Sequence, residues 1–242
     1  MRITRLTAWP FNSRPKPIVG DAIRIRRASA ADVPFLVEAI CEAEKAGTDR
    51  LSYCGIFDLE ETAFRKILES MLLEDLEGQE VCISGFLVAE IADVAIGACC
   101  GWVEGVGGVS SAILKANLLL HAIDRERMRA AQQHFKKLEE LFIARESGAI
   151  QIESVYVRAA GRGRGVAGQL IERHLAELWP ISTAGKAQVI LTATNLAARA
   201  AYARVGFAPV TERWSSDESL LALVPALGKL LMERRSSPNA NP

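Results

Sequence analysis

The segment that most constrains this chain is an apolar strand that runs into a glycine-rich loop and then into a helix. It covers residues 155–168, and its loop at positions 161–165 reads GRGRG. Small residues let the backbone approach a ligand closely, and the first N–H groups of a helix have no partners inside the helix. Those N–H groups and the positive end of the helix dipole bind phosphate oxygens. Because Arg162 and Arg164 add forked cationic donors at the same place, the segment predicts a site for a phosphate-bearing ligand.

The charge balance of the chain leaves any such site to local structure. The 242 residues carry 29 basic and 29 acidic side chains, and half of the residues are hydrophobic. A neutral chain has no general electrostatic attraction to nucleic acid or to an anionic membrane, so we expect neither as a partner. The sequence has no run of about 18 apolar residues and predicts no membrane span. Its length and composition indicate one substantial globular core.

The cysteines and the N-terminal residues indicate the cellular compartment, and the two termini are expected to be extended or mobile. The five cysteines are an odd number and show neither a CxxC pair nor a Cys/His metal spacing. We therefore expect a reducing, cytoplasmic location and no bound metal. Residues 1–20 lack the continuous apolar region of a signal peptide and contain several prolines, which predicts an extended N-terminal arm. Residues 236–242 are polar and predict a mobile tail.

Apolar periodicity predicts strands that alternate with helices, which is typical of a mixed α/β layer structure. Strands are expected at residues 22–28, 81–91, 94–103, 150–157, 188–194, 207–213 and 230–234. Helices are expected at residues 29–45, 58–77 and 195–205, from the glycine-rich loop to residue 179, and within 110–146 as one long or two shorter helices. The sequence therefore predicts a single domain over residues 21–235, with a central sheet of about seven strands and flanking helices.

Two of the expected helices carry start and stop signals. Ser29 is expected to cap the first helix, and Asp58 with Glu61 three residues later has the spacing of a capping box for the second. Gly47 and Gly78 are the expected stops. These signals predict two amphipathic helices in the first third of the chain.

The glycine-rich loop admits two other interpretations. One is a solvated, arginine-rich turn before an ordinary helix. The other is the fold of a dinucleotide-binding oxidoreductase, because residues 163–168 match G-x-G-x-x-G. That fold needs its first glycine almost directly after the strand and an acidic residue at the end of the next strand. Here residues 158–162 intervene and the next strand ends in Thr194 and Asn195, so the dinucleotide fold is disfavoured.

Two motifs resemble those of the GNAT acyltransferase superfamily. Residues 162–167 read RGRGVA and match that family's acetyl-CoA loop, Gln/Arg-x-x-Gly-x-Gly/Ala, at the start of a helix after the fourth strand. Residues 195–207 match the family's Asn-x-x-Ala-x-x-x-Tyr-x-x-x-Gly-Phe at every named position. The order of strands and helices from residue 22 to 234 also resembles the family. The resemblance covers most of the chain apart from the N-terminal arm and residues 105–146.

The resemblance implies how acetyl-CoA would bind as a cosubstrate. The fourth and fifth strands are expected to splay apart, and the pantetheine arm to pair with the fourth strand along Val155, Tyr156 and Val157. The pyrophosphate would be held by the loop residues, which are Arg162, Gly163, Arg164, Gly165, Val166 and Ala167. Asn195 would contact the pantetheine from the other side. Arg199 and Arg204 are both candidates for the adenosine 3′-phosphate.

The resemblance also implies an N-acetyltransferase that moves an acetyl group directly to a primary amine, either a small molecule or a peptide. Tyr202 matches the usual general acid of the family, and its other interpretation is a packing residue on an amphipathic helix. Glu153 on the fourth strand is the candidate general base, with a solvent-facing strand residue as the alternative. Glu104 is a weaker candidate base. A non-catalytic acyl-CoA-binding module on the same fold remains the alternative function.

Residues 105–146 depart from a compact family member because they are longer and strongly helical. Their apolar spacing predicts that they pack on something. That surface is the domain itself, the partner in a homodimer, or a wall of the acceptor site. Acceptor identity in this family lies in such variable segments, so the sequence does not name the amine.

Overall fold

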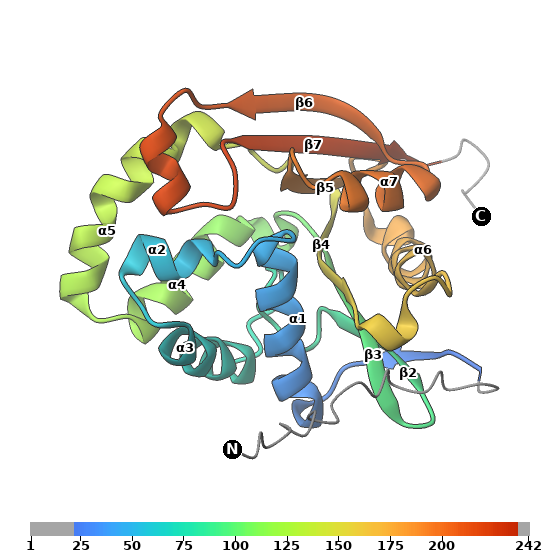
Figure 1. The fold of residues 1–242 in the computed structure, drawn as a ribbon. Helices are drawn as coiled ribbons and strands as arrows, with labels where there is room; N and C mark the ends of the chain where they lie inside the picture. Colours follow the sequence, from blue (N-terminus) through green and yellow to red (C-terminus); the bar gives the residue numbers. More distant parts are fainter. Residues whose placement is uncertain (1–21, 237–242) are drawn as a thin grey trace, which may run out of the picture.

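The protein, described here from a computed structural model that covers residues 22–236, is built around a mixed sheet of seven strands (Figure 1). The strand order is β1-β2-β3-β4-β5-β7-β6, and every neighbouring pair is antiparallel except β4 and β5. The strands are β1 Arg24–Arg27, β2 Phe86–Ile91, β3 Val94–Val103, β4 Ile150–Val157, β5 Lys186–Thr192, β6 Ala208–Trp214 and β7 Gly228–Arg235. The predicted mixed α/β domain with about seven strands is confirmed.

Seven α-helices flank the described sheet. They are α1 Val33–Lys45, α2 Ser52–Phe57, α3 Glu61–Leu73, α4 Ser111–Ala122, α5 Arg125–Leu138, α6 Val166–Leu178 and α7 Leu196–Arg204. Short 3₁₀ turns join some of them, and none of the described helices has the length and apolarity to cross a membrane. The predicted arm at residues 1–20 and residues 237–242 of the predicted tail lie outside the described part of the chain.

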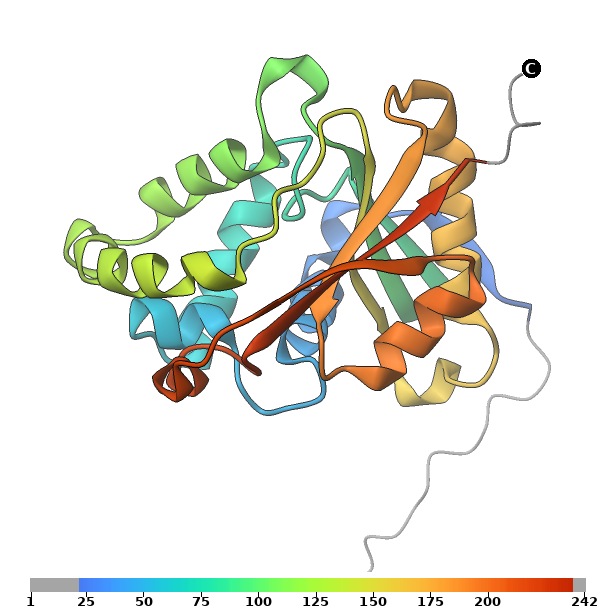
Figure 2. The ribbon, with the colours of Figure 1, turned by 90° about the horizontal axis from the view of Figure 1, so that it is seen from above.

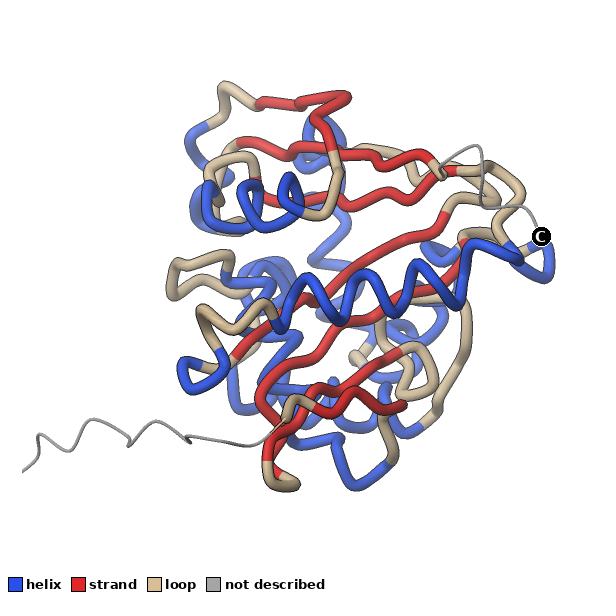
Figure 3. Tube along the Cα trace, turned by 90° about the vertical axis from the view of Figure 1, so that its right-hand side faces the viewer, coloured by secondary structure: helices blue, strands red, loops and turns tan. Residues whose placement is uncertain are grey.

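The sheet separates two hydrophobic clusters because successive side chains of a strand point to opposite faces. On β2, Phe86 and Val88 face the cluster that contains α1, α3 and α4, whereas Leu87 and Ala89 face the cluster that contains α6 and α7. Figure 3 shows α6 lying across the second face. β2 is therefore buried on both sides, which explains why its sequence is apolar at five of six positions instead of alternating; the exception is Glu90, which pairs with Arg24 and Arg26.

Strands β4 and β5 diverge from each other, and this divergence leaves a gap in the middle of the sheet. Their backbones pair only at Ile150 with Ala187 and at Gln151 with Gln188. The two glutamines reinforce that end, since Gln151 Nε2 donates to Gln188 Oε1 over 2.9 Å. The remainder of β4 continues along β3 without a partner on its other side (Figure 1). The splayed strands expected from the family resemblance are present.

One predicted capping box is wrong, and one short helix is missing from the sequence prediction. Asp58 does not begin a helix; it ends α2 in the left-handed conformation at a φ of 51°. Helix α3 begins after Glu60 and ends at Leu73, before Gly78. The capping box lies instead at Ser29 and Asp32, which open the turn before α1. Helix α2 has only six residues, too few for a helical period to show in the sequence.

Residues 105–146 form two helices, and they pack on the domain itself. Ser110 caps α4 by accepting the N–H of Ile113, and Asp124 caps α5 by accepting the N–H of Arg127. Helix α5 packs along α2, and α4 packs along α3. Figure 2 shows the pair on the opposite side of the molecule from α6. Of the two helical arrangements that the sequence allows, the structure has the one with two helices.

Candidate active site

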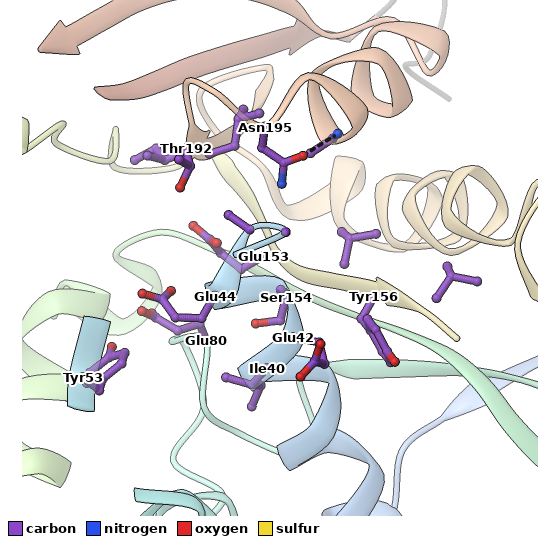
Figure 4. Close-up of a pocket in the computed structure, with 18 of the residues that line it drawn as sticks. Ile40, Glu42, Glu44, Tyr53, Glu80, Glu153, Ser154, Tyr156, Thr192 and Asn195 are labelled. Atoms are coloured by element: carbon purple, nitrogen blue, oxygen red, sulfur yellow. Dashed lines mark hydrogen bonds between the residues drawn. The ribbon is translucent and has the colours of Figure 1, made fainter. Parts of the chain in front are cut away.

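A cavity of about 620 Å³ occupies the gap between β4 and β5 (Figure 4). Its walls come from α1, α2, α3, α4, β4, β5 and α7, which lie far apart in the sequence. Many of the residues predicted for the site meet here: Glu153, Val155, Tyr156, Val157, Arg162, Asn195 and Tyr202. The fold thus brings both predicted motifs and the fourth strand to one cavity.

A second cavity of about 570 Å³ lies at the glycine-rich loop. It is lined by Gly161, Arg162, Gly163, Gly165, Val166, Ala167 and Gly168 of the loop and helix start, and by Arg204 of α7. The two cavities share Val157, Arg162 and Ala201, so they adjoin each other, and together they are called the cleft below. Arg204 faces this end of the cleft, whereas Arg199 lies 3.6 Å from Glu212 on β6. Of the two arginines considered for a terminal phosphate, the structure favours Arg204.

The loop has the geometry of an anion site. Gly163 and Gly165 have φ angles of 77° and 74°, a left-handed conformation that glycine adopts without strain. Their N–H groups donate to no acceptor within residues 22–236. A Cβ placed on Gly163 would meet nothing within 4 Å, so open space lies beside these donors. The loop and the start of α6 therefore fit a diphosphate.

Two details of the loop differ from the prediction that every residue from 162 to 167 helps to hold the pyrophosphate. The backbone N–H of Arg162 donates to the carbonyl of Ala159 over 3.3 Å, so this amide is already engaged. The Arg162 side chain bends back, and its Nε donates to the carbonyl of Val157 over 3.1 Å. Arg164 is exposed on the turn and lines neither cavity. The donors that face the cleft are thus mainly those of Gly163 to Ala167.

A bulge in β4 shapes the middle of the cleft. Cys100 and Ala98 on β3 pair with Glu153 and Tyr156, so β4 has one extra residue in this interval. Ser154 takes the strain with a φ of 52°. A bulge leaves backbone groups of the extra residue outside the ladder and redirects the side chains on either side. Here it turns the stretch from Glu153 to Val157 toward the gap beside β5, where all five residues line the cavity.

Tyr202 lies on α7 at the wall of the cavity and is 7% exposed. Its ring packs edge-on against Phe207 at a centroid distance of 5.8 Å. Burial raises its pKa well above the ordinary value, and the nearby Cys99 and Glu153 add to the shift. The hydroxyl is therefore protonated at neutral pH and can donate a proton. Tyr202 packs on the core, as one of its two predicted interpretations has it, and it also lines the cleft, which the predicted general acid would need to do.

Asn195 marks the start of α7 beside the cavity. Its Oδ1 accepts the N–H of Ala198 over 3.0 Å, which is an N-cap interaction. This bond fixes the side chain at the mouth of the gap, close to Thr192 (Figure 4). The residue is therefore held in place for a contact with a ligand that enters between the strands.

Glu153 belongs to a network of four charged side chains at the other side of the cavity. Arg145 Nη2 donates to Glu153 Oε1 over 2.7 Å and lies 3.9 Å from Glu80 Oε1, and Lys115 pairs with Glu80. Burial raises the pKa of Glu153, and the positive charge of Arg145 opposes that shift. Burial also disfavours the charged form of Glu80, but Lys115 and Arg145 outweigh it and lower its pKa to about 2. Of the two carboxylates in this network, Glu153 is thus the one whose pKa is raised.

Three members of this network were not predicted from the sequence. Glu80 follows α3, Lys115 lies on α4, and Arg145 precedes β4. No spacing rule connects them, because only the folded chain brings them together.

Glu104, the weaker candidate base, has a structural role instead. Its Oε2 accepts the indole N–H of Trp102 over 3.1 Å, and its Oε1 accepts the N–H of Ser111 over 2.9 Å. It is buried and does not line the cleft. Both carboxylate oxygens are used to join β3 to the start of α4, so it is not placed to accept a proton from a substrate.

Comparisons with known proteins agree with this geometry. The model of the acetyltransferase (GNAT) family matches residues 54–207. Among solved structures, an N-acetyltransferase from Staphylococcus aureus Mu50 aligns with a TM-score of 0.60 and 16% identity over 87% of this chain and 99% of that one. The ribosomal-protein-alanine N-acetyltransferase from Brucella melitensis aligns with a TM-score of 0.50 and 16% identity, covering 88% and 99%. These likenesses show a shared fold.

No curated protein matches the chain. The family match nevertheless spans more than half of the residues, and it includes the glycine-rich loop, the splayed strands and the whole of the second motif at residues 195–207. The chain belongs to the acetyltransferase (GNAT) family.

Proposed function

We propose that this protein is an acetyl-CoA-dependent N-acetyltransferase that transfers the acetyl group directly to a primary amine. The observation that carries the proposal is the cleft made of the two adjoining cavities. It joins the glycine-rich loop to the unpaired edge of β4, and its lining includes the protonated Tyr202 and Glu153, a carboxylate of raised pKa. These are the parts that such a transfer needs, in the order in which acetyl-CoA would meet them.

The loop and β4 supply binding and orientation. The N–H groups from Gly163 to Ala167 and the dipole of α6 hold the pyrophosphate, with Arg162 and Arg204 nearby. The free edge of β4 along Val155, Tyr156 and Val157 accepts the pantetheine as an added strand. Holding both reactants side by side contributes much of the rate, because it removes the cost of bringing them together.

The proton balance of the reaction uses Glu153 and Tyr202. Glu153 Oε2 accepts a proton from the ammonium form of the acceptor while Arg145 engages Oε1. The neutral nitrogen attacks the thioester carbonyl, and N–H groups at the β4 bulge stabilise the oxyanion. The C–S bond breaks as Tyr202 donates its hydroxyl proton to the sulfur, and the acetylated nitrogen returns a proton to the tyrosinate. Glu153 releases its proton to solvent, which leaves an acetamide and free CoA.

The test follows free thiol release from acetyl-CoA over a panel of amines, with CoA affinity measured on the same preparation by calorimetry. Turnover with at least one amine supports the proposal. Tight binding of CoA with no turnover on any amine would instead support a non-catalytic acyl-CoA-binding module. Absence of CoA binding would show that the loop does not hold a diphosphate.

A further inference from the structure

The large cavity extends beyond Tyr202 and Glu153, the proposed catalytic pair, into a chamber between α1, α2, α3 and α4. Glu42, Glu44, Tyr53 and Glu80 line part of this chamber, whereas one side of it is apolar and is formed by Ile40, Phe64, Leu68, Met71, Val81 and Leu119. All six belong to one hydrophobic cluster of the core, and none is more than 7% exposed. A polar group placed there without a hydrogen-bond partner would lose its hydration without compensation. The apolar side of the chamber therefore favours an apolar part of a ligand.

The mouth of this chamber is acidic, but nearly all of its charge is neutralised within the protein. Glu80 and Glu153 pair with Lys115 and Arg145, and Glu42 is 3.2 Å from Lys45. Glu44 is different, because it makes no ion pair or hydrogen bond within residues 22–236. Figure 4 shows Glu44 beside Glu80 and below Glu153 at the cavity. One uncompensated carboxylate at the mouth matches an acceptor with one ammonium group.

The helices of residues 105–146 build part of this chamber. Helix α4 contributes Leu119 to the apolar lining and Lys115 to the charged network, and Arg145 follows α5. Tyr53 of α2 stacks on Phe64 of α3 at 5.0 Å with an interplanar angle of 11°, and Lys115 lies 6.0 Å above the Tyr53 ring. The segment that departs from a compact family member is thus a wall beside the reacting groups.

We infer that the acceptor is a primary amine with a single positive charge on an apolar body, such as an arylalkylamine or an alkylamine. Its body occupies the chamber under α1, and Glu44 holds its ammonium group next to Glu153. Polyamines and aminoglycosides should be poorer acceptors, since their further charges or hydroxyls would lie against the apolar side of the chamber. This inference rests on the proposed function and names the substrate class of the same site.

The first experiment compares amines on the wild-type protein. Values of kcat/KM are measured for phenethylamine, hexylamine, spermidine and kanamycin, and binding of each amine to the CoA complex is measured by calorimetry. We expect kcat/KM for phenethylamine and hexylamine to exceed that for the other two by at least ten-fold. An equal or higher value for spermidine or kanamycin would overturn the inference.

The binding measurement separates the two proposals from each other. If phenethylamine binds the CoA complex but no thiol is released, the chamber is supported and the transferase proposal fails. If thiol is released with polar amines and phenethylamine does not bind, the transferase proposal stands and the chamber assignment fails.

A matched pair of leucines on α4 tests the wall. Leu119 lines the chamber, whereas its neighbour Leu118 is also buried but faces a separate groove between α3 and α4. Leu119→Ala should raise the ratio of kcat/KM for naphthylethylamine over phenethylamine at least five-fold, because the chamber gains space. Leu118→Ala should lose comparable thermal stability and leave that ratio unchanged. The same ratio in both variants would contradict the inference.

A matched pair of glutamates tests the charge at the mouth. Glu44→Gln should raise KM for phenethylamine at least five-fold and leave the CoA dissociation constant within two-fold. Glu69→Gln, on the exposed face of α3, should change neither. An unchanged KM in Glu44→Gln would remove Glu44 from acceptor recognition.

Discussion

At the scale of single residues, Tyr202 is the side chain whose environment most directly predicts a kinetic effect. Tyr202→Phe keeps the ring that packs on Phe207 and removes only the hydroxyl. Loss of a general acid costs about 10²–10⁴-fold in rate. We expect kcat to fall by about 100-fold while the CoA dissociation constant and the melting temperature change little. A variant that keeps its full kcat would assign proton donation to another group.

Glu153 predicts the acid side of the pH–rate profile. Burial raises the pKa of Glu153 above its ordinary value of 4.5, and the positive charge of Arg145 opposes this shift. The carboxyl group therefore loses its proton at a pH higher than 4.5. Activity should rise with pH through that pKa, since the carboxylate is the active form. Arg145→Met removes the opposing charge and should move the acid limb of kcat/KM to higher pH. Glu153→Gln should abolish this limb; a limb that persists would belong to a different group.

His174 predicts a pH dependence of stability that is separate from catalysis. The ring is fully buried, donates from Nε2 to the Cys99 carbonyl over 2.8 Å, and has a pKa lowered by burial from 6.5 to about 4. A depressed pKa contributes stability above pH 6.5 that is lost as the pH falls toward 4. The loss approaches about 3 kcal/mol by linkage.

Denaturant titrations of the wild type, His174→Asn and His121→Asn between pH 7 and pH 4 would measure this effect. The exposed His121 variant should follow the wild type, and the His174 variant should lose less stability on acidification. Parallel curves for all three proteins would rule out His174 as the source.

At the scale of elements, the glycine-rich turn before α6 predicts a binding effect that can be separated from a folding effect. Gly163 has a φ of 77°, and Gly107 has a φ of 82° in the turn before α4; a Cβ on either would meet nothing within 4 Å. Alanine at either position should cost about 1–2 kcal/mol of stability through left-handed strain. Only Gly163→Ala should also weaken CoA binding, by about ten-fold in calorimetry. Equal CoA affinity in the two variants would argue against a diphosphate at this turn.

The elements also show what the sequence can predict and what it cannot. Residues 94–103 and 150–157 were predicted with the bounds of β3 and β4, because each is rich in apolar and β-branched residues and is closed by turn or loop residues. The two motifs also led to Tyr202 and Asn195, both of which line the cleft. Helix α2 was missed because its six residues form fewer than two turns. Glu80, Lys115 and Arg145 were missed because tertiary contacts alone bring them to Glu153.

At the scale of the whole molecule, the divergence of β4 and β5 has a thermodynamic consequence. The ladder between these strands has only two residue pairs, next to the Gln151–Gln188 contact. β5, β7, β6 and α7 therefore form a C-terminal layer whose sheet connection to the rest of the protein is short. A ligand that bridges the cleft adds contacts between the two parts and stabilises them together.

That layer should consequently open on its own more often than the N-terminal strands, and a bound coenzyme should suppress its opening. Hydrogen–deuterium exchange would show this as slower exchange of β5 and α7 amides in the presence of CoA, with β2 and β3 almost unaffected. Uniform protection across the sheet would mean that the protein already opens as one unit. If the expected pattern is found, the coenzyme would hold the two parts of the sheet together across the short junction at Gln151 and Gln188, in addition to donating an acetyl group. The amount of CoA in the cell would then affect how long this protein resists proteolysis.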